Sequence, residues 1–181
     1  MGESRIERAI DYITKLFQGN GDGHDLAHSL RVYHNAMMIA EMEGQGEEEI
    51  IALSALLHDC DDHKLFHTEN NANARCFLQQ EGLSEERIEE ICRNINSVSF
   101  SKNRGKVPKT IEGKIVQDAD RLEAIGAIGI ARCFQFGGSH GRSLENSIEH
   151  FYDKLLLISK ELNTPSARKM AEKGISSCRI S

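Results

Sequence analysis

The chain contains little that favours a β-sheet, a disulfide framework or a membrane span. Only two prolines, four valines and four threonines occur among its 181 residues, so strand formers other than isoleucine are few. Five scattered cysteines form no CxxC pair, which argues against a disulfide framework and a cysteine-based zinc site. No apolar run approaches the ~18 residues that a membrane helix needs, and the first residues lack the apolar stretch of a signal peptide. We therefore expect a cytoplasmic protein with reduced thiols and no membrane partner.

Positively charged residues are fewer than negatively charged ones. Lysine and arginine number 22 against 28 aspartates and glutamates, a formal net charge of −6. Such a chain does not hold a nucleic-acid polymer by bulk charge, so any anionic ligand must meet a local basic patch. Hydrophobic residues make up 39% of the sequence, enough for one buried core, and at roughly 150 residues per domain the length predicts one domain.

Apolar residues recur at steps of three and four, which predicts amphipathic helices. The segments with this spacing are 5–17, 26–42, 47–58, 84–98 with Ser84 as N-cap, 110–135 with a break near Gly126, and 144–162. Residues 174–181 lack the pattern and contain poor helix formers. The sequence thus predicts an all-α protein: one helical-bundle domain of about six to nine helices over residues 1–173, and an irregular tail over 174–181.

Two histidines are expected to reach a similar level of a helical hairpin. Gly44 and Gly46 indicate a tight connection between antiparallel helices, with His28 about 17 residues before the turn and His58 about 13 after it. At ~1.5 Å per residue the mismatch is only about 6 Å, so both imidazoles reach a similar level. Together with Asp59 they can share one divalent ion. The alternative is a histidine favoured by the helix dipole beside a solvated aspartate.

A second pair of acids lies inside an otherwise apolar helical segment, at Asp118 and Asp120. Core packing requires neither carboxylate there, and each is costly to bury without a partner. A metal ligand contributed from a distant helix explains such an acid. Pairing with Arg121 is the alternative, and it can apply to Asp118.

These residues carry a resemblance to a known family. His28 in HSLRV, the doublet His58-Asp59 in ALLHDCDDHKLF, and Asp120 in DADRL resemble the H…HD…D signature of the HD-domain metal-dependent phosphohydrolases. The segments HDLAHSLRV, SVSFS and EGKIVQDADRLEAIGAIGIARCFQFGG look like one bacterial subfamily of nucleotide pyrophosphohydrolases. The resemblance runs from about residue 5 to 173. It departs near the C-terminus, where the stretch between Arg142 and Phe151 is shorter and the last eight residues lack the expected helix.

The resemblance implies that His28, His58, Asp59 and Asp120 bind one divalent metal ion. Mn²⁺, Fe²⁺, Ni²⁺, Co²⁺ or Zn²⁺ suit such a mixed nitrogen and oxygen site, whereas Mg²⁺ prefers oxygen alone. Asp62 occupies the position of a general base or acid that orients water in related enzymes, and Lys64 is a candidate for holding a phosphate. Exposed polar loop residues are the alternative for both, and we expect Asp61 on the surface.

Further residues are candidates for substrate contacts. Residues 101–109 carry four cations and no acid, and they precede the helix of Asp120, so this loop can reach over the metal toward a triphosphate. A solvated basic loop is the alternative. The predicted substrate contacts are His24, Lys102, Arg104, Lys106 and Arg121, with Lys109 in the same loop.

The function implied is hydrolysis of nucleoside triphosphates to monophosphate and pyrophosphate by a metal-activated water. The expected partner is a small-molecule nucleotide, on a monomer or homodimer. One alternative changes the bond that is cleaved and gives a 5′-nucleotidase or a cyclic-nucleotide phosphodiesterase. Another is a metal-bound nucleotide sensor without turnover, against which Asp62 argues because a binder needs no proton-transfer group.

Overall fold

A computed structural model describes residues 2–18, 26–63, 65–150 and 158–176. Within these ranges the chain is helical and has no strand, which confirms the all-α prediction. The helices are α1 (Arg5–Leu16), α2 (Leu26–Glu43), α3 (Glu48–Leu57), α4 (Ala72–Gln80), α5 (Glu85–Val98), α6 (Phe100–Asn103), α7 (Ile111–Glu123), α8 (Ala127–Ser139), α9 (Leu144–His150), the 3₁₀ helix η2 (Ser159–Glu161) and α11 (Pro165–Ser176).

Local sequence signals explain where several helices begin and end. Ser4 and Glu7 form a reciprocal capping box at the start of α1. Ser84 caps α5 as predicted, by accepting a hydrogen bond from the Arg87 N–H, and Thr110 caps α7 in the same way. The predicted break at Gly126 is also present: its φ of +88° separates α7 from α8.

The connection between α2 and α3 depends on glycine. Gly44 and Gly46 both have positive φ, at +62° and +93°. A Cβ atom on Gly46 would lie 2.8 Å from the Cδ1 atom of Ile51, so a side chain at this position would also require the Ile51 side chain to shift. This tight loop allows α2 and α3 to pack directly against each other.

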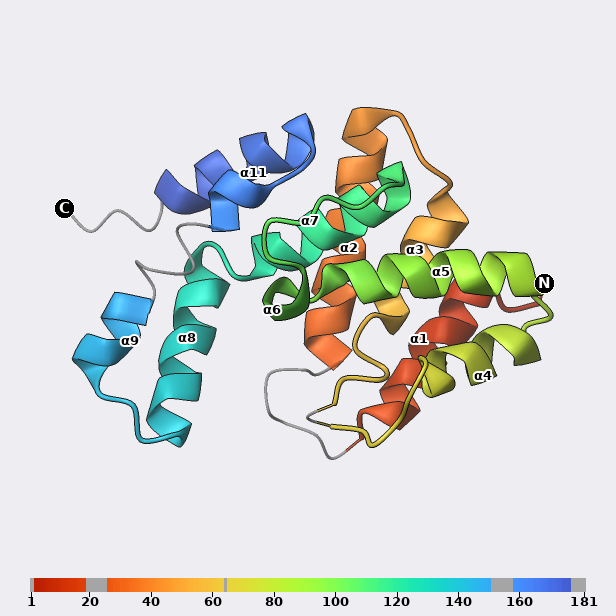
Figure 1. Ribbon diagram of the computed structural model, residues 1–181, viewed down its shortest axis with the longest axis horizontal. Helices are drawn as coiled ribbons and strands as arrows, with labels where there is room; N and C mark the ends of the chain where they lie inside the picture. Colours follow the sequence, from red (N-terminus) through yellow and green to blue (C-terminus); the bar gives the residue numbers. More distant parts are fainter. Residues whose placement is uncertain (1, 19–25, 64, 151–157, 177–181) are drawn as a thin grey trace.

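Helix α3 is the centre of the core. Every residue from Ile50 to Leu57 is buried. Ile50 and Leu53 belong to an apolar cluster shared with α1, α4 and α5, whereas Ile51 and Ala55 belong to a second cluster shared with α2 and α7. Helices α8 and α9 pack together at the end of the molecule opposite α1 and α4 (Figure 1). His58 directly follows the buried helix α3.

Some predicted elements differ from the structure. The described residues contain ten α-helices, one above the predicted range, because α4 and the four-residue α6 are too short for apolar periodicity to reveal. Asp61, expected on the surface, is half-buried and accepts hydrogen bonds from the backbone N–H groups of Asn73 and Ala74 at 2.9 and 3.1 Å, at the start of α4.

The C-terminal part was predicted only in outline. The helix expected over 144–162 begins as α9 and ends as η2, while its middle, 151–157, lies outside the described residues. Helix α11 runs to Ser176, three residues into the expected irregular tail, and residues 177–181 also lie outside the description. No helix in the described part of the chain has the length and apolarity required to cross a bilayer.

Candidate metal centre

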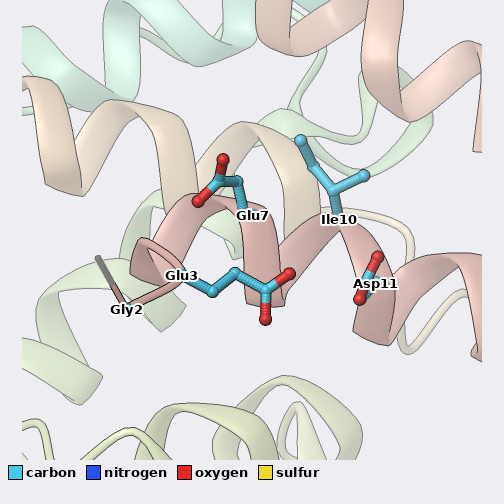
Figure 2. A pocket seen from close by; sticks show the side chains of 5 residues that line it. All are labelled: Gly2, Glu3, Glu7, Ile10 and Asp11. Atoms are coloured by element: carbon cyan, nitrogen blue, oxygen red, sulfur yellow. The ribbon is translucent and has the colours of Figure 1, made fainter.

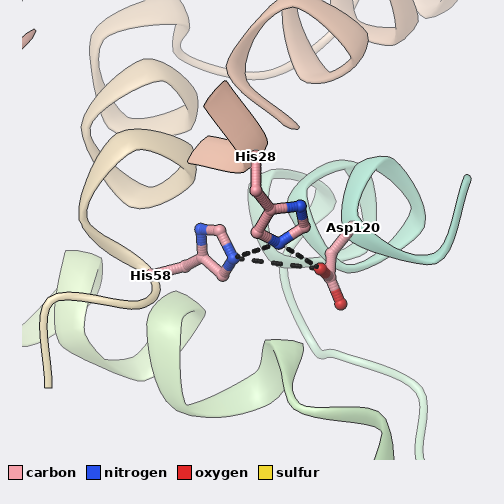
Figure 3. Close-up of side chains that lie close together, drawn as sticks. All are labelled: His28, His58 and Asp120. Atoms are coloured by element: carbon pink, nitrogen blue, oxygen red, sulfur yellow. Dashed lines mark hydrogen bonds and ion pairs between the residues drawn. The ribbon is translucent and has the colours of Figure 1, made fainter. Parts of the chain in front are cut away.

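Two histidines and an aspartate from three helices converge at the centre of the bundle (Figure 3). His28 lies in α2, His58 directly follows α3, and Asp120 lies in α7. The two imidazole Nε2 atoms are 3.3 Å apart. The Oδ1 atom of Asp120 lies 3.3 Å from Nε2 of His28 and 3.8 Å from Nε2 of His58. The hairpin therefore brings the two imidazoles together as the glycine spacing predicted.

Asp59 adds a second carboxylate to the same point. Its Oδ2 atom lies 3.6 Å from Nε2 of His28 and 3.3 Å from Nε2 of His58. The two imidazole side chains are only 4% and 3% exposed, whereas Asp120 is 22% exposed. Thus the nitrogen donors are buried, and the carboxylate of Asp120 is the more exposed of the two carboxylates. All four residues that the sequence resemblance implied as ligands lie within contact distance of the two Nε2 atoms.

The electrostatics of the cluster favour a positive charge at its centre. Burial opposes charging of His58, but the neighbouring carboxylates of Asp59 and Asp120 prevail and raise its pKa to about 9. Burial likewise opposes the charged form of His28, whose pKa is nevertheless raised by Asp120 and Glu123. Desolvation opposes ionisation of Asp120, yet the two histidines lower its pKa. The carboxylates are therefore arranged to stabilise a cation, either imidazolium or a metal ion.

The ring nitrogens that face away from the cluster set the orientation of the two histidines. Nδ1 of His58 lies 2.8 Å from the carbonyl oxygen of Ala55, to which it can donate, so Nε2 keeps a lone pair for a cation. Nδ1 of His28 lies 3.7 Å from Oε2 of Glu123 and 2.9 Å from Nη1 of Arg132. Metal-binding histidines are commonly held through this second nitrogen.

Glu123 is a site residue that the sequence analysis did not identify. Its carboxylate accepts a 2.6 Å hydrogen bond from Nε of Arg31 and lies 3.9 Å from Nη1 of Arg132. Burial would raise its pKa, but His28 and Arg31 lower it, so Glu123 is held as a carboxylate beside the histidine. Glu123 could have been predicted from the sequence, because it lies three residues after Asp120 and therefore on the same face of the helix.

Asp118 has a structural environment. It is fully buried in α7 and accepts hydrogen bonds of 2.7–3.0 Å from the backbone and side chains of Asn163 and Thr164. Burial raises its pKa despite these bonds. Arg121, the partner considered from sequence, instead donates through Nη1 to the carbonyl of Glu161. Asp118 therefore anchors the segment after η2 to α7.

Asp62 is positioned by the turn that carries Asp59. Its N–H donates to the Asp59 carbonyl at 3.1 Å, and its half-buried carboxylate lies 4.0 Å from Nδ1 of His63. The candidates His24 and Lys64 lie outside the described residues. Lys102, Arg104 and Lys106 are exposed on and after α6.

Lys106 and Arg121 line a pocket on another part of the surface, together with Lys114, Lys160, Glu161 and Arg168. None of the four candidate metal ligands lines that pocket. A different hollow, near the start of α1, is lined by Gly2, Glu3, Glu7, Ile10 and Asp11 (Figure 2). Its three carboxylates make it unsuitable for an anionic substrate.

Two histidines and two aspartates around one point are a set of ligands typical of a divalent-metal centre. The family model described as HD domain matches residues 25–125, a range that contains all four of these residues. The chain belongs to the HD domain family, and it has the fold of structures described as HD-superfamily hydrolases.

Individual relatives cover nearly the whole chain. The chain is 37% identical to the uncharacterised protein YpgQ of Bacillus subtilis over 93% of its own length and 85% of the relative's. A crystal structure of that protein in complex with ADP matches with a TM-score of 0.83 at 32% identity, covering 96% and 89% of the two chains. An HD-superfamily hydrolase from Bacillus thuringiensis matches with a TM-score of 0.79 at 35% identity, covering 96% and 90%.

Proposed function

We propose that this protein is a metal-dependent phosphohydrolase that hydrolyses nucleoside triphosphates to a nucleoside monophosphate and pyrophosphate. The observation that carries the proposal is the buried cluster of two imidazoles and two carboxylates at the centre of an HD-domain fold. The similar Bacillus subtilis protein was crystallised with ADP, which supports a nucleotide as the ligand here.

The residues present fit a divalent ion. Nε2 of His28, Nε2 of His58 and Oδ1 of Asp120 all lie within 4.8 Å of one another, and Oδ2 of Asp59 lies within 3.6 Å of both nitrogens. We propose that these four side chains hold Mn²⁺, Fe²⁺, Ni²⁺, Co²⁺ or Zn²⁺, since each accepts a mixed set of nitrogen and oxygen donors. When bound, such an ion lowers the pKa of water and offsets negative charge on a phosphate.

The chain's own groups would perform the remaining steps. We assign Asp62 the transfer of the proton from the attacking water, because it lies one turn beyond Asp59 and keeps its carboxylate partly exposed. Glu123 would hold the ring of His28 so that Nε2 faces the cluster. The low exposure of both imidazoles limits the access of bulk water to the ligands.

The substrate phosphates need cations near the carboxylate of Asp120, which is partly exposed. We propose Lys64, Lys102 and Arg104 for this role, together with His24. A chain with a net charge of −6 that concentrates cations in one loop can attract a polyphosphate to that place. A nucleotidase grips one terminal phosphate and needs fewer such groups. This difference favours cleavage after the α-phosphate.

The test is to incubate purified protein with Mn²⁺ and a panel of nucleoside mono-, di- and triphosphates and cyclic nucleotides, and to identify the products. We expect a triphosphate to give monophosphate and pyrophosphate with little orthophosphate. In ¹⁸O-water the label should enter the monophosphate, because the α-phosphorus is attacked. Orthophosphate as the main early product, or preferred cleavage of monophosphates, would favour a nucleotidase. Tight nucleotide binding without turnover would favour a sensor.

A further inference from the structure

A second concentration of positive charge lies away from the candidate metal centre. The pocket of about 340 Å³ between residues 105–107, α7 and the segment 160–168 is lined by five cationic side chains and one carboxylate. Its cations are Lys106, Lys114, Arg121, Lys160 and Arg168, and the acid is Glu161. This volume is at the lower end of the range for small-molecule sites. The lining of this pocket therefore carries a positive charge, although the chain as a whole has a net charge of −6.

Most of these cations have no acid to neutralise them. Among the described residues, no hydrogen bond or ion pair involves the ammonium groups of Lys114 and Lys160. Arg168 donates to the carbonyl oxygens of Leu162 and Asn163 at 3.0 and 3.3 Å, which leaves its charge unpaired. Glu161 lies 3.7 Å from Nη2 of Arg121, but its Oε2 atom also accepts a hydrogen bond from the N–H of Gly105. Surface cations normally repel one another, so this grouping suits an anion.

Arg121 forms the buried wall of the pocket and is the second sign of a ligand. It is only 2% exposed, and its Nε and Nη2 atoms have no hydrogen-bond partner among the described residues. Burial lowers its pKa, because nearby carboxylates only partly offset the lost hydration. Nε and Nη2 form one edge of the guanidinium, the pair of donors that binds two oxygens of a phosphate or carboxylate at once.

The pocket lies on a different face of α7 from the metal centre. Successive residues on an α-helix are rotated by about 100°, so Asp120 and Arg121 leave α7 in different directions. Lys114 precedes Arg121 by seven residues, about two turns, and therefore shares its face. None of the four candidate metal ligands lines the pocket.

We propose that this pocket is a second anion site that binds a condensed phosphate, such as pyrophosphate or the phosphate tail of a nucleotide, without a metal ion. Several separated cations favour a ligand whose negative charge is spread over more than one phosphate group. The proposal does not depend on hydrolysis at the metal centre, since binding is measured in protein from which metal has been removed.

The experiment is calorimetric titration of tripolyphosphate into metal-free protein at low ionic strength, where exposed charges are least screened. We expect one binding event per chain. The double variant Lys114→Gln/Lys160→Gln should weaken it roughly tenfold, given the modest worth of each exposed ion pair. The matched control Lys15→Gln/Lys169→Gln removes the same charge outside the pocket and should change affinity less than about twofold.

A third variant tests whether removing a negative charge from the pocket strengthens anion binding. Glu161→Gln removes the only acid that the described residues contribute to the pocket lining, while keeping an acceptor for the N–H of Gly105, so it should tighten binding. Titrations with orthophosphate, pyrophosphate and a nucleoside triphosphate then compare their affinities. They show whether the pocket prefers a free condensed phosphate or the phosphate tail of a nucleotide. The proposal is overturned by binding that requires added Mn²⁺, by equal weakening in the control, or by an absence of binding.

Discussion

Raising the pH of the metal-free protein should destabilise its fold, because His58 is charged in the folded state. Burial disfavours the imidazolium, but Asp59 and Asp120 raise the pKa of His58 from 6.5 to about 9. A folded-state pKa above the unfolded value stabilises the fold below pH 6.5, and this contribution is lost as the pH rises through about 9. At about 1.4 kcal/mol per pH unit, the loss is at most about 3.5 kcal/mol. His28, whose pKa is also raised, acts in the same direction.

Urea unfolding of chelator-treated and dialysed protein, near pH 6.5 and above pH 9, measures this loss. His58→Gln has no titrating imidazole, so most of the difference in unfolding free energy between the two pH values should disappear. With saturating Mn²⁺ the protein should instead become more stable as the pH rises. An ion that replaces the proton of His58 binds more tightly at high pH, where that proton is easier to remove. The reasoning is refuted if metal-free protein is at least as stable above pH 9, or if His58→Gln keeps the full dependence.

Four substitutions and one control test the roles of individual side chains. His58→Ala and Asp59→Ala should each lose bound metal and activity while most far-UV helical signal persists, and full occupancy by elemental analysis in both would contradict the ligand assignment. Asp62→Asn should retain metal but lower kcat by about 10²–10⁴, the usual contribution of one positioned acid or base; turnover at the parental rate would make Asp62 an ordinary surface residue. Glu123→Gln should weaken metal binding by about 10–100-fold. The control Glu145→Gln, at an exposed position of α9, should leave metal affinity unchanged. Equal metal affinities of the two variants would show that Glu123 does not belong to the site.

The meeting of His28 and His58 could be predicted because it depends on short-range geometry. A helix rises by a fixed amount per residue, and the glycines at 44 and 46 fix the position of the turn. Counting residues from that turn was therefore enough to bring the two rings to one level, and their Nε2 atoms lie 3.3 Å apart. The acid Asp120 was recognisable because an unpaired carboxylate is costly in an apolar helix.

The partners of Asp118 and Arg121 could not be read in the same way. Asp118 accepts hydrogen bonds from Asn163 and Thr164, and Arg121 donates to Glu161, all at least 40 residues further along the chain. Glu161 ends the helical segment expected over 144–162, and Asn163 and Thr164 follow it, but nothing in the sequence places this region against α7. Tertiary docking decides such contacts, and apolar spacing predicts only which face of a helix is buried.

Helix α7 connects the metal centre to the anion pocket without making them one site. Along its length Asp120 and Glu123 face the two histidine-bearing elements, Asp118 holds Thr164, and Arg121 faces the pocket. The metal centre depends on the packing of α2, α3 and α7, which the apolar core fixes. The pocket depends in addition on the segment after η2, which Asp118 anchors by hydrogen bonds. Because the two sites share only this helix, a change in the C-terminal segment can alter anion binding while the four candidate ligands keep their positions.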